Sequence, residues 1–139
     1  MPVRVEIVSQ DRMVYSGDAD MVLIPGAEGM MGILPHHTPV LTVIQYGIIT
    51  IKEGGQEKHY TVAGGIAEVQ PDQITILADA AENVAEIDIQ RAQEARQRAE
   101  ELLKKGVGKE TDAYLSIQAA LRRSNLRVDA VHRYRRSQR

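Results

Sequence analysis

Arginine dominates the end of the chain. From residue 122 on, a single acid, Asp129, faces seven arginines: Arg122, Arg123, Arg127, Arg133, Arg135, Arg136 and Arg139. Cations near a helix C-terminus are favoured by the helix dipole, so this segment can be a solvated helix end. It can also be a basic rod that binds an acidic partner. Nucleic acid is a third candidate, but the chain has only five Tyr for base stacking and an acidic first half.

Other chemistry-bearing motifs are weak. The glycines of residues 26–32 lack the spacing and the following helix of a dinucleotide-binding loop, and residues 106–109 lack the first Gly and the Ser/Thr of a phosphate loop. His36 and His37 point to opposite sides of an extended chain, so they cannot easily share a metal ion. The sequence contains no Cys and no evident Ser-His-Asp set. We therefore expect no catalytic residues, no metal site and no enzymatic activity.

Charge and composition divide the chain into two regions. The 139 residues carry a net charge of −2, which is the sum of −7 over residues 1–84 and +5 over residues 85–139. All five Pro and nine of the eleven Gly precede residue 85. With no apolar run long enough to span a bilayer and no signal peptide, we expect a soluble, intracellular protein of two regions, 1–84 and 85–139.

The first region has the pattern of short β-strands. Residues 3–7 alternate apolar and polar side chains, which predicts a half-buried strand. Short runs rich in β-branched residues follow, separated by turn residues; they are 21–24, 40–44, 48–51, 60–62 and 74–77. Gly54-Gly55 predicts a hairpin turn. This spacing indicates an antiparallel sandwich or barrel.

The second region has the pattern of two helices. Apolar residues recur every three or four positions from Ile89 to Leu102 and again from Tyr114 to Val131. Lys104-Lys105-Gly106 predicts the end of the first helix, and Thr111 or Asp112 can cap the second. The seam, which is the face along which the two helices would pack, is poor in large side chains, with Leu102 or Leu103 at its end. We therefore expect an antiparallel hairpin that is marginally held and can open.

Residues 29–42, 64–69 and 74–82 resemble the hallmark segments of the epsilon subunit of F-type ATP synthases. The resemblance implies an α+β chain: a ten-stranded β-sandwich over residues 1–84, then two antiparallel helices over 85–139. It implies a central-stalk rotor component that binds the gamma subunit, the c-subunit ring and the alpha/beta catalytic subunits. Such a protein couples proton translocation to ATP synthesis without catalysing a reaction. It would lie on the cytoplasmic face of the cell membrane, peripherally and without inserting, and bind no nucleic acid.

The same resemblance implies a regulatory role for the hairpin. Folded against the sandwich it would permit ATP hydrolysis, and extended along gamma it would inhibit it. The inhibitory contact with beta would then fall on four arginines: Arg122, Arg123, Arg127 and Arg133.

A narrower match concerns ATP. Ile87-Asp88-x-x-Arg91-Ala92 resembles the motif of epsilon subunits that bind ATP, with or without Mg, as a regulatory ligand. The match carries over onto seven residues: Glu82, Ile87, Asp88, Arg91, Ala92, Arg123 and Arg127. Asp88 and Arg91, like Arg123 and Arg127, have the spacing of one helix face, and guanidinium groups suit a triphosphate. Asp88 would repel phosphate, so it would read the adenine or ribose end. The alternative is an ordinary Asp88–Arg91 surface pair contributing about 0.2–0.5 kcal/mol.

The resemblance also implies an interface with the c ring and gamma at Glu28, Met30, Met31 and His37. Some relatives carry an acid at the position of Met30 or Met31, where this chain offers adaptable apolar contacts instead. The alternative function is a small protein that binds anionic surfaces or nucleic acid through residues 122–139. Co-purification with a gamma subunit, against salt-sensitive retention on DNA, separates the two.

Overall fold

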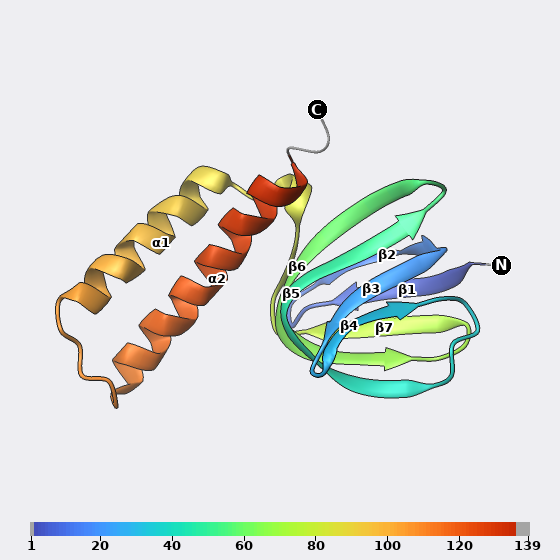
Figure 1. Cartoon of the computed structure of the whole chain (residues 1–139), viewed down its shortest axis with the longest axis horizontal. Helices are drawn as coiled ribbons and strands as arrows, with labels where there is room; N and C mark the ends of the chain where they lie inside the picture. The colour runs from blue at the N-terminus through green and yellow to red at the C-terminus, as the bar shows by residue number, and fades with distance from the viewer. Residues whose placement is uncertain (1, 136–139) are drawn as a thin grey trace. The chain divides into compact units, whose positions relative to one another are not determined.

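The computed structural model describes residues 2–135, in two compact units, Met1–Asn83 and Val84–Arg139 (Figure 1). Arg136 and Arg139 of the basic C-terminus lie outside the described residues. The first unit consists of strands and the second of helices, so the predicted sandwich followed by a helical hairpin is confirmed.

The strand unit is one sheet of eight strands that folds over on itself. In chain order they are β1 (Val3–Val8), β2 (Met13–Ala19), β3 (Met21–Gly26), β4 (Gly29–Ile33), β5 (Val40–Glu53), β6 (Gln56–Val69), β7 (Gln73–Ala78) and β8 (Ala81–Asn83). Their order across the sheet is β2-β1-β7-β6-β5-β3-β4, with β8 paired to β6. All pairs are antiparallel except β1 with β7.

Two long strands explain why the described residues form eight strands where ten were expected. β5 and β6 have 14 residues each and pair with one another along their whole length, joined by the predicted turn at Gly54-Gly55. Each curves from one layer of the sandwich to the other (Figure 1). The first part of β6 therefore pairs with β8 and its last part with β7.

The sandwich core is aliphatic, as the lack of Phe and Trp requires. Its large fully buried side chains are Ile and Val, and they come from inward-facing positions that alternate with outward-facing ones along the strands; in β1 these are Val3, Val5 and Ile7. Tyr60 is the one aromatic residue in this cluster. Such a core stabilises the fold through burial of apolar area, at roughly 25 cal/mol per Å2.

As far as Arg135, the helical unit consists of the 3-10 turn η1 (Val84–Glu86) and the helices α1 (Ile89–Lys104) and α2 (Asp112–Tyr134). α1 ends as predicted, with Lys105 as C-cap and Gly106 in the left-handed region at φ 84°. Of the two candidate caps for α2, Thr111 serves: its hydroxyl accepts the Tyr114 N–H at 3.1 Å.

Small residues form the buried seam between the two helices. In α1 only Ala92 and Ala99 are buried, whereas Leu102 is 44% exposed. In α2 the buried residues are Ser124, Val128, Ala130 and Val131. The helices can approach closely, but little apolar area leaves water, which supports the expectation of a marginally held hairpin.

Candidate nucleotide and docking sites

Asp88 is the N-cap of α1. Its backbone is extended (φ −80°, ψ 99°), and Oδ1 accepts the backbone N–H of Arg91 at 3.1 Å. The sequence spacing suggested that Asp88 and Arg91 share a helix face; instead Asp88 precedes the first turn and fixes where the helix starts. Its carboxylate lies at the positive end of the helix dipole, and both Asp88 and the Arg91 side chain are exposed.

The apolar members of the motif are buried. Ile87 is 2% and Ala92 0% exposed, so neither side chain is available to a ligand. The Ile87 carbonyl accepts a hydrogen bond from the guanidinium of Arg135, at the far end of α2. Ile87 and Ala92 therefore hold the corner in place, and of the four named motif residues Asp88 and Arg91 are the exposed ones.

Arg91 and two arginines of α2 lie toward the same end of the antiparallel hairpin (Figure 1). In an antiparallel hairpin, residues equally far from the loop are neighbours along the axis. Arg91 is as far from the end of α1 as the point midway between Arg123 and Arg127 is from the start of α2. Both arginines therefore lie in the half of α2 that runs beside the first half of α1. Arg123 is exposed and Arg127 half-buried.

Glu82 belongs to the other unit. It lies in β8, half-buried, opposite Thr61 of β6. The helical residues of the predicted site thus share one unit, while the acid comes from the strand unit.

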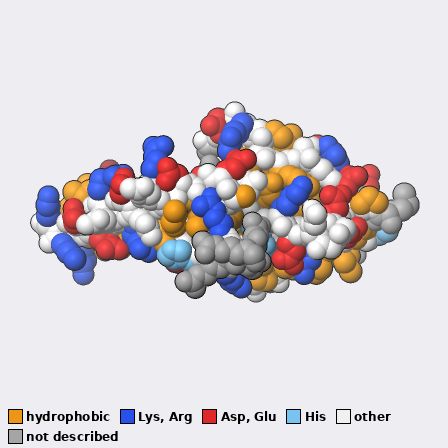
Figure 2. Space-filling view, turned by 90° about the horizontal axis from the view of Figure 1, so that it is seen from above, with side chains coloured by type: hydrophobic (Ala, Val, Ile, Leu, Met, Phe, Trp, Pro, Cys, Tyr) orange, Lys and Arg blue, Asp and Glu red, His pale blue; other side chains and the backbone are white. Residues whose placement is uncertain are grey.

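The four arginines assigned to the inhibitory contact are spread over the later turns of α2. Arg122, Arg123 and Arg133 are exposed. The Arg133 guanidinium lies over the Tyr134 ring, 5.2 Å from its centroid. Charged side chains of both signs are scattered over the face of the molecule that Figure 2 shows.

The predicted interface residues surround the turn between β3 and β4 and the segment that precedes β5. Glu28 is exposed in the turn, and Met30 is 61% exposed on β4. Met31, opposite Ile24, is half-buried and packs against the core. His37 is half-buried, with Nδ1 2.6 Å from the Thr38 carbonyl oxygen. Met30 and Glu28 are therefore the exposed members of this set.

A row of outward apolar side chains crosses the sheet, and the sequence analysis missed it. Paired positions on successive strands β5, β6, β7, β1 and β2 are Val43, Ile66, Leu77, Val8 and Met13. Val43 is 61%, Leu77 54% and Ile66 44% exposed. The alternation within each strand could have marked these positions as outward, but only strand pairing aligns them.

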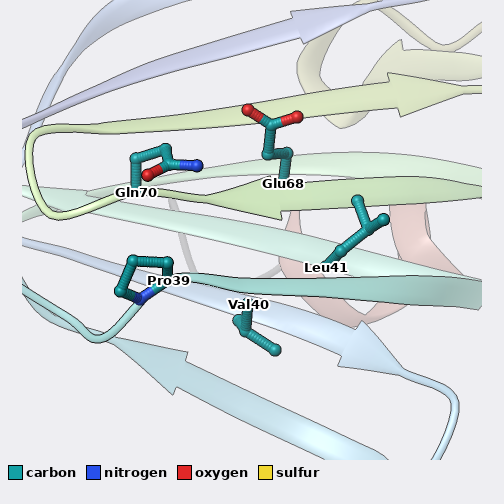
Figure 3. Close-up of a pocket in the computed structure, with 5 residues that line it drawn as sticks. All are labelled: Pro39, Val40, Leu41, Glu68 and Gln70. Atoms are coloured by element: carbon teal, nitrogen blue, oxygen red, sulfur yellow. The ribbon is translucent and has the colours of Figure 1, made fainter.

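A polar row lies beside the apolar one. Glu68 of β6 pairs with Leu41 of β5 and with Thr75 of β7, and Thr75 pairs with Glu6 of β1. Leu41 and Glu68 line a shallow hollow of about 320 Å3 with Pro39, Val40 and Gln70 (Figure 3). The outer face of the sheet therefore offers an apolar strip bordered by carboxylates.

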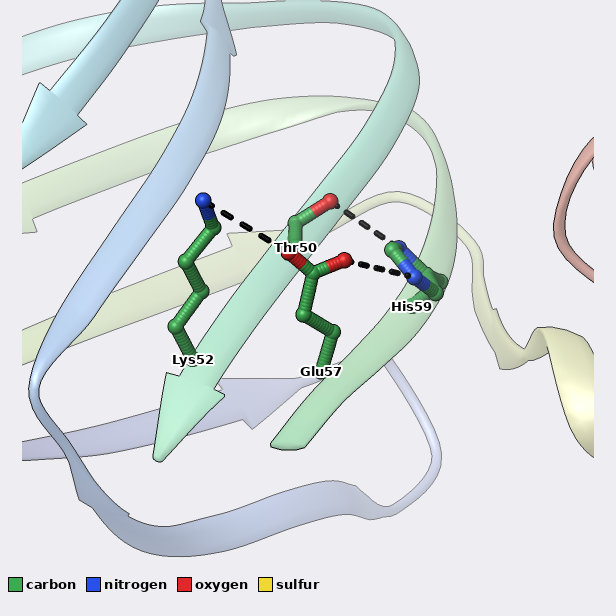
Figure 4. A network of polar contacts seen from close by, with 4 residues as sticks. All are labelled: Thr50, Lys52, Glu57 and His59. Atoms are coloured by element: carbon green, nitrogen blue, oxygen red, sulfur yellow. Dashed lines mark hydrogen bonds and ion pairs between the residues drawn. The ribbon is translucent and has the colours of Figure 1, made fainter. Parts of the chain in front are cut away.

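A polar network, buried at Thr50 and His59 and solvent-accessible at Lys52 and Glu57, closes the β5–β6 hairpin. The Thr50 hydroxyl lies 3.0 Å from Nδ1 of His59, and Nε2 of His59 lies 3.5 Å from Glu57 (Figure 4). Glu57 also pairs with Lys52 at 3.5 Å. These groups satisfy one another and fix the register of the hairpin. Within residues 2–135 no cluster of His, Asp and Glu could hold a metal ion.

Comparison with known proteins identifies the class. Residues 2–84 match the family described as ATP synthase, Delta/Epsilon chain, beta-sandwich domain, and residues 85–132 match its long alpha-helix domain. The chain therefore belongs to the ATP synthase delta/epsilon family.

Individual relatives narrow the assignment. The ATP synthase epsilon chain of Herpetosiphon aurantiacus is 42% identical over 128 residues, 92% of this chain and 93% of the relative. That of Dehalococcoides mccartyi strain BAV1 is 40% identical over 140 residues, 96% of this chain and 95% of the relative. Within the family this chain is thus an epsilon-type, non-catalytic subunit of an F-type ATP synthase.

Solved structures share the fold. A chain of the Euglena gracilis mitochondrial ATP synthase, determined with OSCP, F1 and the c-ring, superposes with a TM-score of 0.76 at 23% identity; the match covers 94% of this chain and 82% of that one. No helix within the described residues is both long and apolar enough to cross a membrane.

Proposed function

We propose that this subunit couples proton translocation to ATP synthesis as part of the central stalk, and that its hairpin regulates ATP hydrolysis under the control of bound ATP. One observation carries the regulatory part. The exposed Arg91 lies in the first turn of α1, beside its capped N-terminus, and Arg123 and Arg127 lie in the second half of the antiparallel α2.

This arrangement suits a nucleotide. Three guanidinium groups supply charge-assisted donors for the triphosphate, and the positive end of the α1 dipole favours the same charge. One carboxylate oxygen of Asp88 accepts the Arg91 N–H, and the second oxygen can accept a hydrogen bond from the ribose or the base. Any Mg would be bound through the phosphates.

Ligand binding to the closed state alone would shift the hairpin equilibrium. The stabilisation is about 2.7 kcal/mol when free ATP exceeds its dissociation constant a hundredfold. A seam built on Ala92 and Ala99 contributes little by comparison, so ATP would decide between closed and open. In the open state, the extended α2 would carry Arg122, Arg123, Arg127 and Arg133 to acidic segments of the beta subunits, and hydrolysis would be inhibited.

The sandwich would provide the permanent attachment. The apolar row across β5, β6, β7, β1 and β2 suits a gamma subunit that presents apolar side chains bordered by cations, because Glu68 and Glu6 flank the row. Met30 and Glu28 would meet the c ring. The subunit would then lie at the cytoplasmic face of the membrane as a peripheral part of the complex.

Calorimetric titration of the isolated subunit with ATP tests the nucleotide site. We expect Arg91→Ala or Arg123→Ala to abolish measurable binding, because each removes a donor to phosphate. Lys104→Ala is the matched control, since it removes an exposed cation from the other end of α1. Unchanged ATP affinity in both arginine variants would exclude the site; far-ultraviolet circular dichroism verifies that the sandwich stays folded.

A further inference from the structure

Arg135 joins the two open ends of the hairpin. It is the C-cap of α2, and its backbone N–H bonds the Val131 carbonyl at 3.0 Å. Its guanidinium donates a hydrogen bond to the carbonyl of Ile87, which immediately precedes the cap of α1. The resemblance to known motifs assigns no role to this residue.

The residues around this hydrogen bond explain why it can stabilise the closed hairpin. α2 has 23 residues against 16 in α1, so its last turns run past the start of α1 and pack against η1. Val84 of η1 and Ile87 are 3% and 2% exposed. The Ile87 N–H bonds the Val84 carbonyl at 3.4 Å, which fixes the corner from one side. The hydrogen bond from Arg135 to the Ile87 carbonyl fixes the corner from the other side.

We propose that Arg135 is the latch of the hairpin and a positioning residue for its nucleotide site. By holding the Ile87 carbonyl, it holds Asp88, whose carboxylate caps α1 and so sets the direction in which Arg91 leaves the helix. Opening the hairpin breaks this hydrogen bond. Because the buried seam between the helices consists of small residues, Ala, Ser and Val, one charge-assisted hydrogen bond at its open end contributes a large part of the free energy that keeps the hairpin closed.

The latch is tested without nucleotide. The chain has no Cys, so Gln90→Cys and His132→Cys, both at exposed positions, place two spin labels across the open end. We expect Arg135→Ala to lengthen and broaden the label-to-label distance distribution, and Arg135→Lys to restore it in part. Arg133→Ala, an exposed cation two positions earlier, is the control and should leave it unchanged. A distribution in Arg135→Ala identical to that of the parent would overturn the latch.

The positioning role, which rests on the proposed ATP site, is tested by titration of the same full-length variants. We expect Arg135→Ala to weaken ATP binding about tenfold, the effect of one charge-assisted hydrogen bond, and Arg135→Lys to recover part of the loss. If Arg135→Ala opens the hairpin but binds ATP as the parent does, the positioning role is wrong. If the parent itself binds no ATP, the proposed nucleotide function fails, and the distances alone decide the latch.

Discussion

Tyr15 makes the stability of the sandwich depend on pH. Its ring lies 5.4 Å from that of Tyr60, and the Lys58 ammonium lies 5.3 Å from its centroid. Burial raises the pKa of the Tyr15 hydroxyl, and the nearby carboxylates Glu53 and Asp18 raise it further, with Arg4 opposing them. The folded chain therefore holds this proton more tightly than the unfolded chain does.

A loss of stability at alkaline pH follows. Below about pH 10, the pKa of Tyr in the unfolded chain, the Tyr15 hydroxyl is protonated in both the folded and the unfolded state. Its full contribution to the free energy of unfolding is then present. As the pH rises from there to the raised folded pKa, the unfolded state loses its proton first and gains stability. We expect the free energy of unfolding, measured with urea, to fall more between pH 8 and 10.5 in the parent than in Tyr15→Phe. Equal losses in the two proteins would contradict the assignment.

At the scale of elements, the bend of β6 depends on Gly64 and Gly65. Both have positive φ, 93° and 140°. A Cβ on Gly65 would lie 2.3 Å from the Leu77 carbonyl oxygen, so backbone of β7 occupies the space a side chain would need. Close approach here lets one strand serve both layers.

Two glycine substitutions separate conformational strain from this close approach. Gly55 at the hairpin turn also has positive φ, 80°, but open space around it. We expect Gly55→Ala to cost about 1 kcal/mol, the penalty of a left-handed conformation, and Gly65→Ala to cost about 3 kcal/mol or more. Thermal and urea unfolding measure both. Similar costs would mean that the contact with Leu77 relaxes freely.

The same bend shows what the sequence could and could not predict. Predictions are confirmed where one or two neighbouring residues determine the local structure. These are the turn at Gly54-Gly55, the end of α1 at Gly106 and the cap of α2 at Thr111. Gly64-Gly65 looks like the same kind of signal, yet β6 runs through it, because glycine can bend a strand whose ladder continues on both sides.

In the candidate sites, too, the local features could be predicted from the sequence and the long-range contacts could not. The resemblance to ATP-binding epsilon subunits implied Arg91, Arg123 and Arg127 as a group, and all three lie on the two helices of the hairpin. The capping role of Asp88 and the bond from Arg135 to Ile87 depend on backbone geometry and on a contact across 48 residues of sequence. The apolar row across the sheet depends on the register of five strands. Such long-range pairing cannot be read from a local pattern.

At the scale of the whole molecule, the outer face of the sandwich should determine assembly. We expect Ile66→Glu to weaken association with the gamma subunit at least tenfold. It replaces an apolar contact of about 1.5–3 kcal/mol by a charge next to Glu68. Its own fold should be nearly unchanged, since Ile66 is 44% exposed.

Gln56→Glu adds the same charge at an exposed position of the same strand, away from the row, and serves as the control. Co-purification with gamma and the c ring, at several salt concentrations, measures the effect. Equal retention of the two variants would remove the row from the interface.

The alanine seam of the hairpin has a thermal consequence. Heat capacity rises with exposed apolar area, by about 0.45 cal/mol/K per Å2. Parting α1 from α2 exposes Ala92, Ala99 and the small buried residues of α2, so opening would change the heat capacity far less than unfolding of the sandwich does. The ratio of closed to open hairpins would then follow a nearly straight van't Hoff line, free of the curvature that marks the unfolding of the sandwich.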